Sequence, residues 1–203
     1  MKRLRSFLLF FTAILFACNN DGSNTTTTTN DSANQPDQTA TTTDTSNAAN
    51  TNTTANATPL DKMDSAFVMK AAAGGMMEVE AGNIAQQNAE SQRVKDFGAM
   101  MVRDHSQAND ELRRLASSHG LTLPTELPAD MRKHLDAMRK MTGKAFDKHY
   151  MSMMLSDHKK DVGEFEKASK MCKAEDCLGF AAKTLPVLRT HLDSAQAISK
   201  SKM

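Results

Sequence analysis

From about residue 59 onward, apolar residues recur every three or four positions, and this spacing predicts helices. The expected elements are four long helices and one short amphipathic helix, over about residues 59–89, 91–118, 146–171, 175–199 and 129–141. Gly120 and Gly143 are expected to end helices. No stretch alternates with a period of two over a useful length, so the pattern predicts an all-α domain without a sheet.

One segment of this pattern is written twice, at a constant offset and without a gap. Phe97, Met100, Met101, Val102, Asp104, His105, Glu111 and Leu112 recur as Tyr150, Met153, Met154, Leu155, Asp157, His158, Glu164 and Phe165. A repeat of this length usually marks one supersecondary unit that is used twice. We therefore expect two repeated helical hairpins that pack as a four-helix bundle, with the short helix in the central connection.

The Asp-His pair is the polar dipeptide kept at equivalent places in both copies, which makes it the first place to look for chemistry. The other two long helices contribute a glutamate and a further histidine to the same buried layer. Three imidazoles and one carboxylate suit iron, copper or zinc, and bundle cores build metal sites from inward side chains. The resulting prediction is a metal site of Glu78, His105, His158 and His191, with Asp104 and Asp157 orienting imidazoles on neighbouring helices.

A competing interpretation needs no metal. Di-iron sites of this fold class use Glu-x-x-His on two helices, but the residues three positions before the histidines are Val102, Leu155 and Leu188. The supply of carboxylates is therefore too low for the usual di-iron oxygen chemistry. A buried hydrogen-bond network of histidines and aspartates would instead fix the register of the helices. The sequence favours this interpretation, in which the domain is a non-enzymatic binding or interaction module.

The first part of the chain predicts export and membrane anchoring. A basic start (Met1 to Arg5), an apolar run over residues 7–17 and then Cys18 are typical of a bacterial lipoprotein signal, which we place at residues 1–18. The apolar run is shorter than the roughly 20 residues that span a bilayer. Residues 19–58 are rich in Thr and Asn and are expected to form a disordered tether. The helical domain follows at residues 59–200, and the outer membrane is the expected location.

The cysteines and the charge balance refine this picture. If Cys18 carries lipid, Cys172 and Cys177 remain as a pair in an oxidising compartment, which predicts a disulfide that closes the turn between the last two helices. A metal site is the alternative, but no second thiol pair exists to complete a zinc site. The net charge of +1 and the absence of Trp argue against a nucleic-acid partner.

Several short runs together resemble one bacterial family. They lie at residues 78–82, 94–97, 101–105, 146–150, 157–158, 185–186 and 191–192. They resemble the domain-of-unknown-function family 4142, whose members are often labelled predicted outer-membrane proteins, over about residues 65–197. The resemblance implies a ferritin-like bundle in the cell envelope and no established activity.

Overall fold

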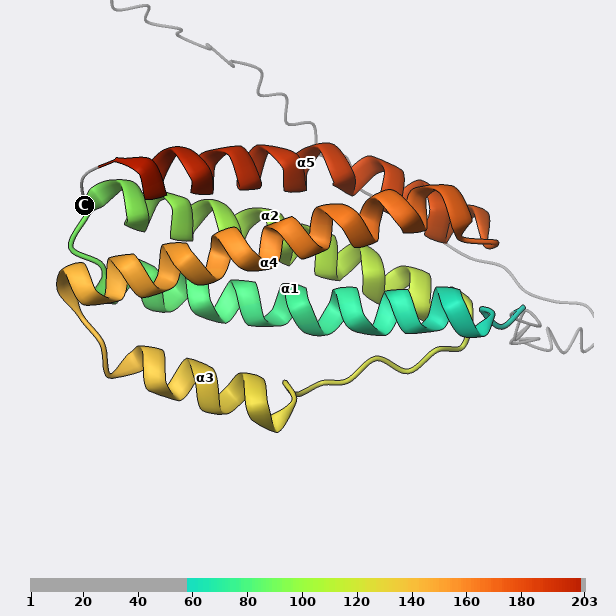
Figure 1. Cartoon of the computed structure of the whole chain (residues 1–203). Coiled ribbons are helices and arrows are strands. Elements are labelled where there is room, and N and C mark those ends of the chain that lie inside the picture. Colours follow the sequence, from blue (N-terminus) through green and yellow to red (C-terminus); the bar gives the residue numbers. More distant parts are fainter. Residues whose placement is uncertain (1–57, 202–203) are drawn as a thin grey trace, which may run out of the picture. The chain divides into compact units, whose positions relative to one another are not determined.

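The computed structural model describes residues 58–201, and over that range it contains five helices and no strand (Figure 1). The helices are α1 (Lys62–Asn88), α2 (Gln92–Ser118), α3 (Ala129–Arg139), α4 (Gly143–Met171) and α5 (Glu175–Lys200). None of these five helices has the length and hydropathy needed to cross a membrane. The expected signal with Cys18, and the tether up to residue 57, lie outside the described residues.

The four long helices form two hairpins that pack side by side. α1 packs mainly on α2, and α4 packs mainly on α5; contacts of α2 with α5 and of α1 with α4 close the bundle. Figure 1 shows that α2 and α4 run in the same direction, because the connection through α3 returns the chain to the end where α2 began. The repeated segments therefore lie on two parallel helices, the second of one hairpin and the first of the other.

The start of the domain differs from the prediction. The sequence pattern predicted a helix from about residue 59, but α1 begins at Lys62 and its N-cap is Asp61. The Asp61 side chain accepts a hydrogen bond from the backbone N–H of Asp64 at 2.8 Å, which is the usual way of satisfying a free N–H at a helix start. Gly120 follows α2 with a φ of 66°, as expected of a residue that ends a helix.

A close approach of α1 and α2 depends on glycine at two positions. A Cβ added to Gly82 would lie 2.6 Å from the carbonyl oxygen of Gly98, and one added to Gly98 would lie 2.8 Å from that of Gly82. Both distances are shorter than carbon and oxygen tolerate. At the Gly74-Gly75 pair of α1, only Gly75 is crowded, by the side chain of Asn109.

A layer of polar side chains divides the core into two apolar clusters. One cluster includes Phe97, Tyr150 and Ala195, and the other includes Leu112 and Phe165. The buried polar residues between them are Glu78, His105, His158 and His191, one from each long helix. Each helix therefore contributes apolar turns on either side of a single polar turn at mid-bundle.

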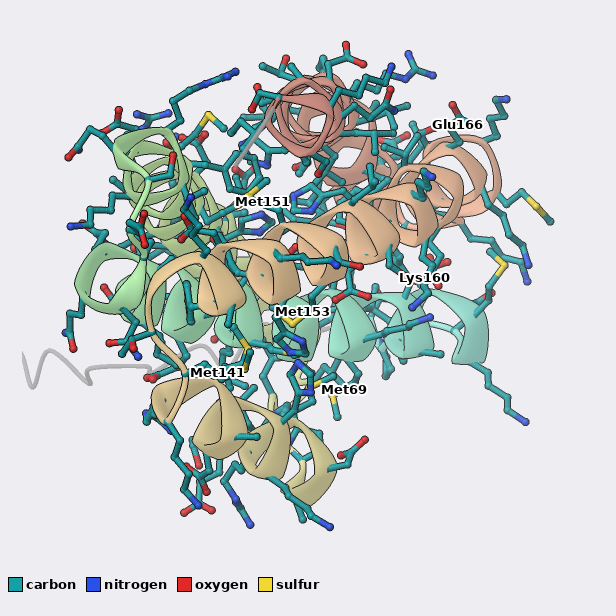
Figure 2. All side chains as sticks on the ribbon, turned by 60° about the vertical axis from the view of Figure 1, so that its left-hand side comes forward. Met69, Met141, Met151, Met153, Lys160 and Glu166 are labelled. Carbon is teal, nitrogen blue, oxygen red and sulfur yellow. The ribbon has the colours of Figure 1, made fainter. Side chains whose placement is uncertain are left out.

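Methionines fill much of the first cluster. Met101, Met151 and Met154 are fully buried, which is the ordinary use of this flexible side chain in irregular helical cores. Figure 2 shows Met151 on the inner side of α4 and Met153 on the side that faces α3. The sulfur of Met153 lies 3.0 Å from Nε2 of His134 on α3, so this contact helps to hold the connection against the bundle.

Candidate metal centre

The structure brings together the four side chains that the sequence singled out. Glu78, His105, His158 and His191 are at most 6 % exposed and meet in the polar layer. The three histidines each offer a ring nitrogen within 4.8 Å of those of the other two. Three helices thus direct one imidazole each toward a common point.

Two of these imidazoles have one nitrogen fixed by an acceptor. His158 Nδ1 lies 3.0 Å from the carbonyl oxygen of Met154, and His191 Nε2 lies 2.9 Å from Oδ2 of Asp104. Because carbonyl and carboxylate oxygens only accept, both nitrogens carry hydrogen. The two remaining nitrogens, His158 Nε2 and His191 Nδ1, face each other at 3.3 Å. In neutral imidazoles both of them present lone pairs, so neither can donate to the other.

His105 has the same arrangement. Its Nδ1 lies 3.0 Å from Oε2 of Glu78, so this nitrogen donates to the carboxylate. Its other nitrogen, Nε2, is buried and has no hydrogen-bond partner in the described part of the chain. Each of the three histidines is therefore oriented from outside by an oxygen and has its second nitrogen left for the centre. Such a centre can accommodate a cation or a shared proton.

The charges in the layer show where a proton resides in the metal-free protein. Burial opposes ionisation of Glu78, but the adjacent His105 holds the pKa of this carboxyl below its usual value. Burial likewise opposes protonation of His105, yet Glu78 raises its pKa. Burial lowers the pKa of His158, and it lowers that of His191 to about 4. The proton therefore belongs on His105, and the other two rings stay neutral.

Sequence reasoning missed Asp161, which lies one turn beyond His158 on α4. Asp161, Glu78 and His158 each offer a ligand atom within 4.8 Å of the others. Burial, followed by the charges of Glu78 and Asp157, raises the pKa of Asp161 to about 8. The equivalent position in the first copy of the repeat is Ala108, so a comparison of the two copies conceals this carboxyl. The sequence signal that could have identified Asp161 is its position three residues after His158.

The expected role of Asp157 is wrong. We expected Asp104 and Asp157 to orient imidazoles on neighbouring helices, and Asp104 does so through His191. Asp157 instead accepts a hydrogen bond from Nζ of Lys160 at 3.1 Å, on the outside of its own helix. Of the two repeated aspartates, only the first contributes to the centre.

A cavity lies beside the histidines. Its volume is about 380 Å³, and its polar lining includes Glu78, His105 and Asp161. This space gives the centre room for a small molecule next to the imidazole of His105.

The state of Cys172 and Cys177 in the structure differs from the sequence prediction. Both are buried free thiols in the structure, and not the disulfide that we expected. Their sulfur atoms lie within 4.8 Å of each other, and a disulfide would bring them to about 2.0 Å. The structure thus contains the reduced pair, and the bond stays a prediction for oxidising conditions.

Comparisons with known proteins agree with this architecture. The model of the family described as Domain of unknown function (DUF4142) matches residues 49–198. The crystal structure of a DUF305 fragment from Deinococcus radiodurans has a similar fold, with a TM-score of 0.61 and 7 % identity, over 70 % of this chain and 97 % of that one. At this identity the likeness shows the fold alone, an all-α helical bundle. No curated protein matches the chain.

Proposed function

We propose that this chain, which belongs to the DUF4142 family, binds a divalent transition-metal ion through His105, His158 and His191. The observation that carries the proposal is the separation of 3.3 Å between His158 Nε2 and His191 Nδ1, two nitrogens whose lone pairs face each other. Zinc–nitrogen bonds of about 2.0–2.1 Å in tetrahedral geometry place two nitrogens about 3.3–3.4 Å apart. The rings are therefore spaced as ligands of one ion.

The carboxylates act on the rings and not on the ion. Glu78 Oε2 is engaged by His105, and Asp104 Oδ2 is engaged by His191. A carboxylate that holds the distal nitrogen of a ligating histidine fixes its tautomer and orientation, and this pairing is common around bound metals. Glu78 thus serves a different purpose from the direct ligand that we predicted.

An unpartnered atom favours this interpretation over a purely structural network. His105 Nε2 is buried without a hydrogen bond in the described part of the chain. A network selected only to fix helix register would satisfy such an atom, because it costs about 1–3 kcal/mol when left alone. An ion at the centre uses the lone pair of His105 Nε2 directly.

The donor set suits zinc, copper or iron, and three nitrogen ligands leave a coordination position free. A bound ion of this kind supplies Lewis-acid or redox chemistry. Asp161 lies nearby as a carboxyl that retains its proton near neutral pH, because its pKa is raised to about 8. It is therefore the group of this chain best placed to give or take a proton beside the cavity.

The test is a metal titration of the full chain carrying Cys18→Ser, Cys172→Ser and Cys177→Ser, so that only the histidine centre is tested. The protein is loaded in turn with Zn²⁺, Cu²⁺ and Fe²⁺, freed of loosely bound ions and analysed for metal by mass spectrometry. We expect about one ion per chain, because the three rings converge on one point. The control is the triple variant His105→Gln, His158→Gln, His191→Gln with unchanged helical content. Equal metal content in both proteins would overturn the proposal.

We also propose that the chain is a lipoprotein of the bacterial envelope, anchored through Cys18. The support is the basic start, short apolar run and cysteine of residues 1–18. Cys18→Ser should release the protein from sedimented membranes. Continued sedimentation of this variant would count against the anchor.

A further inference from the structure

A second cluster of ligand-type side chains lies away from the histidines. It consists of Asp64 near the start of α1 and the two cysteines that flank the turn between α4 and α5, at one end of the bundle (Figure 1). Asp64 and Cys177 have no exposed surface, and Cys172 is 7 % exposed. Each of the three offers one ligand atom within 4.8 Å of the other two.

We propose that Asp64, Cys172 and Cys177 form a second metal site, which is suited to Zn²⁺. Two thiolates and a carboxylate are donors that zinc accepts in its tetrahedral sites. Zinc–sulfur bonds of about 2.3 Å place two sulfurs roughly 3.8 Å apart, which is compatible with ligand atoms that lie within 4.8 Å of one another. Asp64 supplies the additional ligand that the sequence, with one thiol pair, lacked.

The position of Asp64 is the observation that makes this cluster more than a packed cysteine pair. Its Oδ2 accepts hydrogen bonds from the backbone N–H groups of Lys173 and Ala174, both at 2.9 Å. These bonds anchor the carboxylate to the turn that carries both cysteines. Its other oxygen, Oδ1, is buried and has no partner among the described residues. Asp64 is therefore a fully buried carboxylate whose second oxygen is available to bind an ion beside the two thiols.

Loading this site exchanges protons for the ion. Burial is the main reason that the pKa of each thiol is raised, and the nearby Asp64 carboxylate adds to it, so both cysteines are protonated without metal. Binding of Zn²⁺ breaks two S–H bonds, forms two Zn–S bonds and releases two protons to solvent. Cys177 lies in the first turn of α5, where the helix dipole stabilises the resulting thiolate. Oxidation to the disulfide removes both sulfur ligands, so the two forms exclude each other.

The experiment uses the full chain with Cys18→Ser, which leaves Cys172 and Cys177 as the only thiols, in the background of the triple histidine variant. The protein is reduced, its two free thiols are counted, and Co²⁺ is added as a spectroscopic substitute for Zn²⁺. We expect a thiolate-to-cobalt charge-transfer band that saturates at one equivalent and disappears when Zn²⁺ is added. This readout does not depend on the histidine centre, so either proposal can fail alone.

The matched variants separate ligands from neighbours. Cys172→Ser with Cys177→Ser should abolish the band while helical content stays unchanged, and Asp64→Asn should weaken binding at least about tenfold. Asp61→Asn is the control, because this carboxylate caps the same end of α1 without joining the cluster. Absence of the band in reduced protein with two free thiols would overturn the proposal. So would a band that survives the double serine variant.

Discussion

The two Asp-His pairs are identical in sequence and have different partners in the folded chain. Asp104 on α2 reaches across to α5 and binds His191 at 2.9 Å. Asp157 on α4 binds Lys160, which lies one turn further along the same helix. Both neighbouring histidines point into the polar layer, so the repeat specifies the place of the imidazoles but not that of the carboxylates.

The reason lies in what the adjacent hairpin presents. α2 packs against α5, which offers an imidazole to Asp104. α4 packs against α1, which carries the carboxylate of Glu78 at this level of the bundle. Two carboxylates repel each other unless one is protonated, so Asp157 finds a lysine outside instead. The two copies of the repeat therefore make different contacts because different helices lie beside them.

The largest expected effect falls on the feature that the two copies share. His105→Gln and His158→Gln should each weaken metal binding by more than about 100-fold, beyond the 10–100-fold typical of residues that only orient a ligand. Competition with a coloured chelator measures the affinity. His119→Gln is the matched control, because this histidine binds Asp176 and the Thr58 carbonyl far from the centre. Wild-type affinity in either of the first two variants would show that the copies do not share a role.

The next effect should separate the two aspartates. Asp104→Asn removes the acceptor that orients His191, and we expect affinity for the ion to fall about 10–100-fold. Asp157→Asn removes only an exposed ion pair with Lys160, which is worth about 0–1 kcal/mol at a surface, so affinity should change less than about threefold. Equal losses in the two variants, measured in the same competition assay, would refute the asymmetry.

The smallest effect concerns stability and the carboxyl that has no counterpart in the first copy. The pKa of Asp161 is about 8 in the folded protein against 3.8 for the free group. The folded state therefore keeps a proton that the unfolded state loses, and stability of the metal-free protein should fall as pH rises from about 4 to about 8. Asp161→Asn should remove this slope and increase the stability at pH 7. Urea unfolding at pH 4.5, 6 and 7.5 checks this.

Asp110→Asn serves as the comparison in those unfolding experiments. Its carboxylate has an arginine partner, Arg113, at the surface, so its removal should change stability by about 0.5 kcal/mol or less at each pH. If the Asp161→Asn curve ran parallel to that of the wild type, the buried carboxyl would not be the source of the pH dependence.

The helices and their buried faces could be predicted because helical periodicity is local. The four central residues could be predicted as well, since each lies on the apolar stripe of its own helix. The hydrogen-bond partner of each carboxylate could not be predicted from the sequence, because it depends on which helices become neighbours. Asp64 is the clearest case: it binds the backbone N–H of Lys173 across 109 residues of chain, and nothing near Asp64 in the sequence indicates this.

The polar layer also determines which parts of the bundle open together by local unfolding. Apolar packing is interrupted at mid-bundle, so the cluster around Phe97 can open without exposing the cluster around Leu112. In the metal-free protein, amide hydrogen exchange should therefore reveal two cooperative units along a single set of helices. An ion held by the three imidazoles, as proposed, would tie α2, α4 and α5 together at this boundary and merge the two units into one.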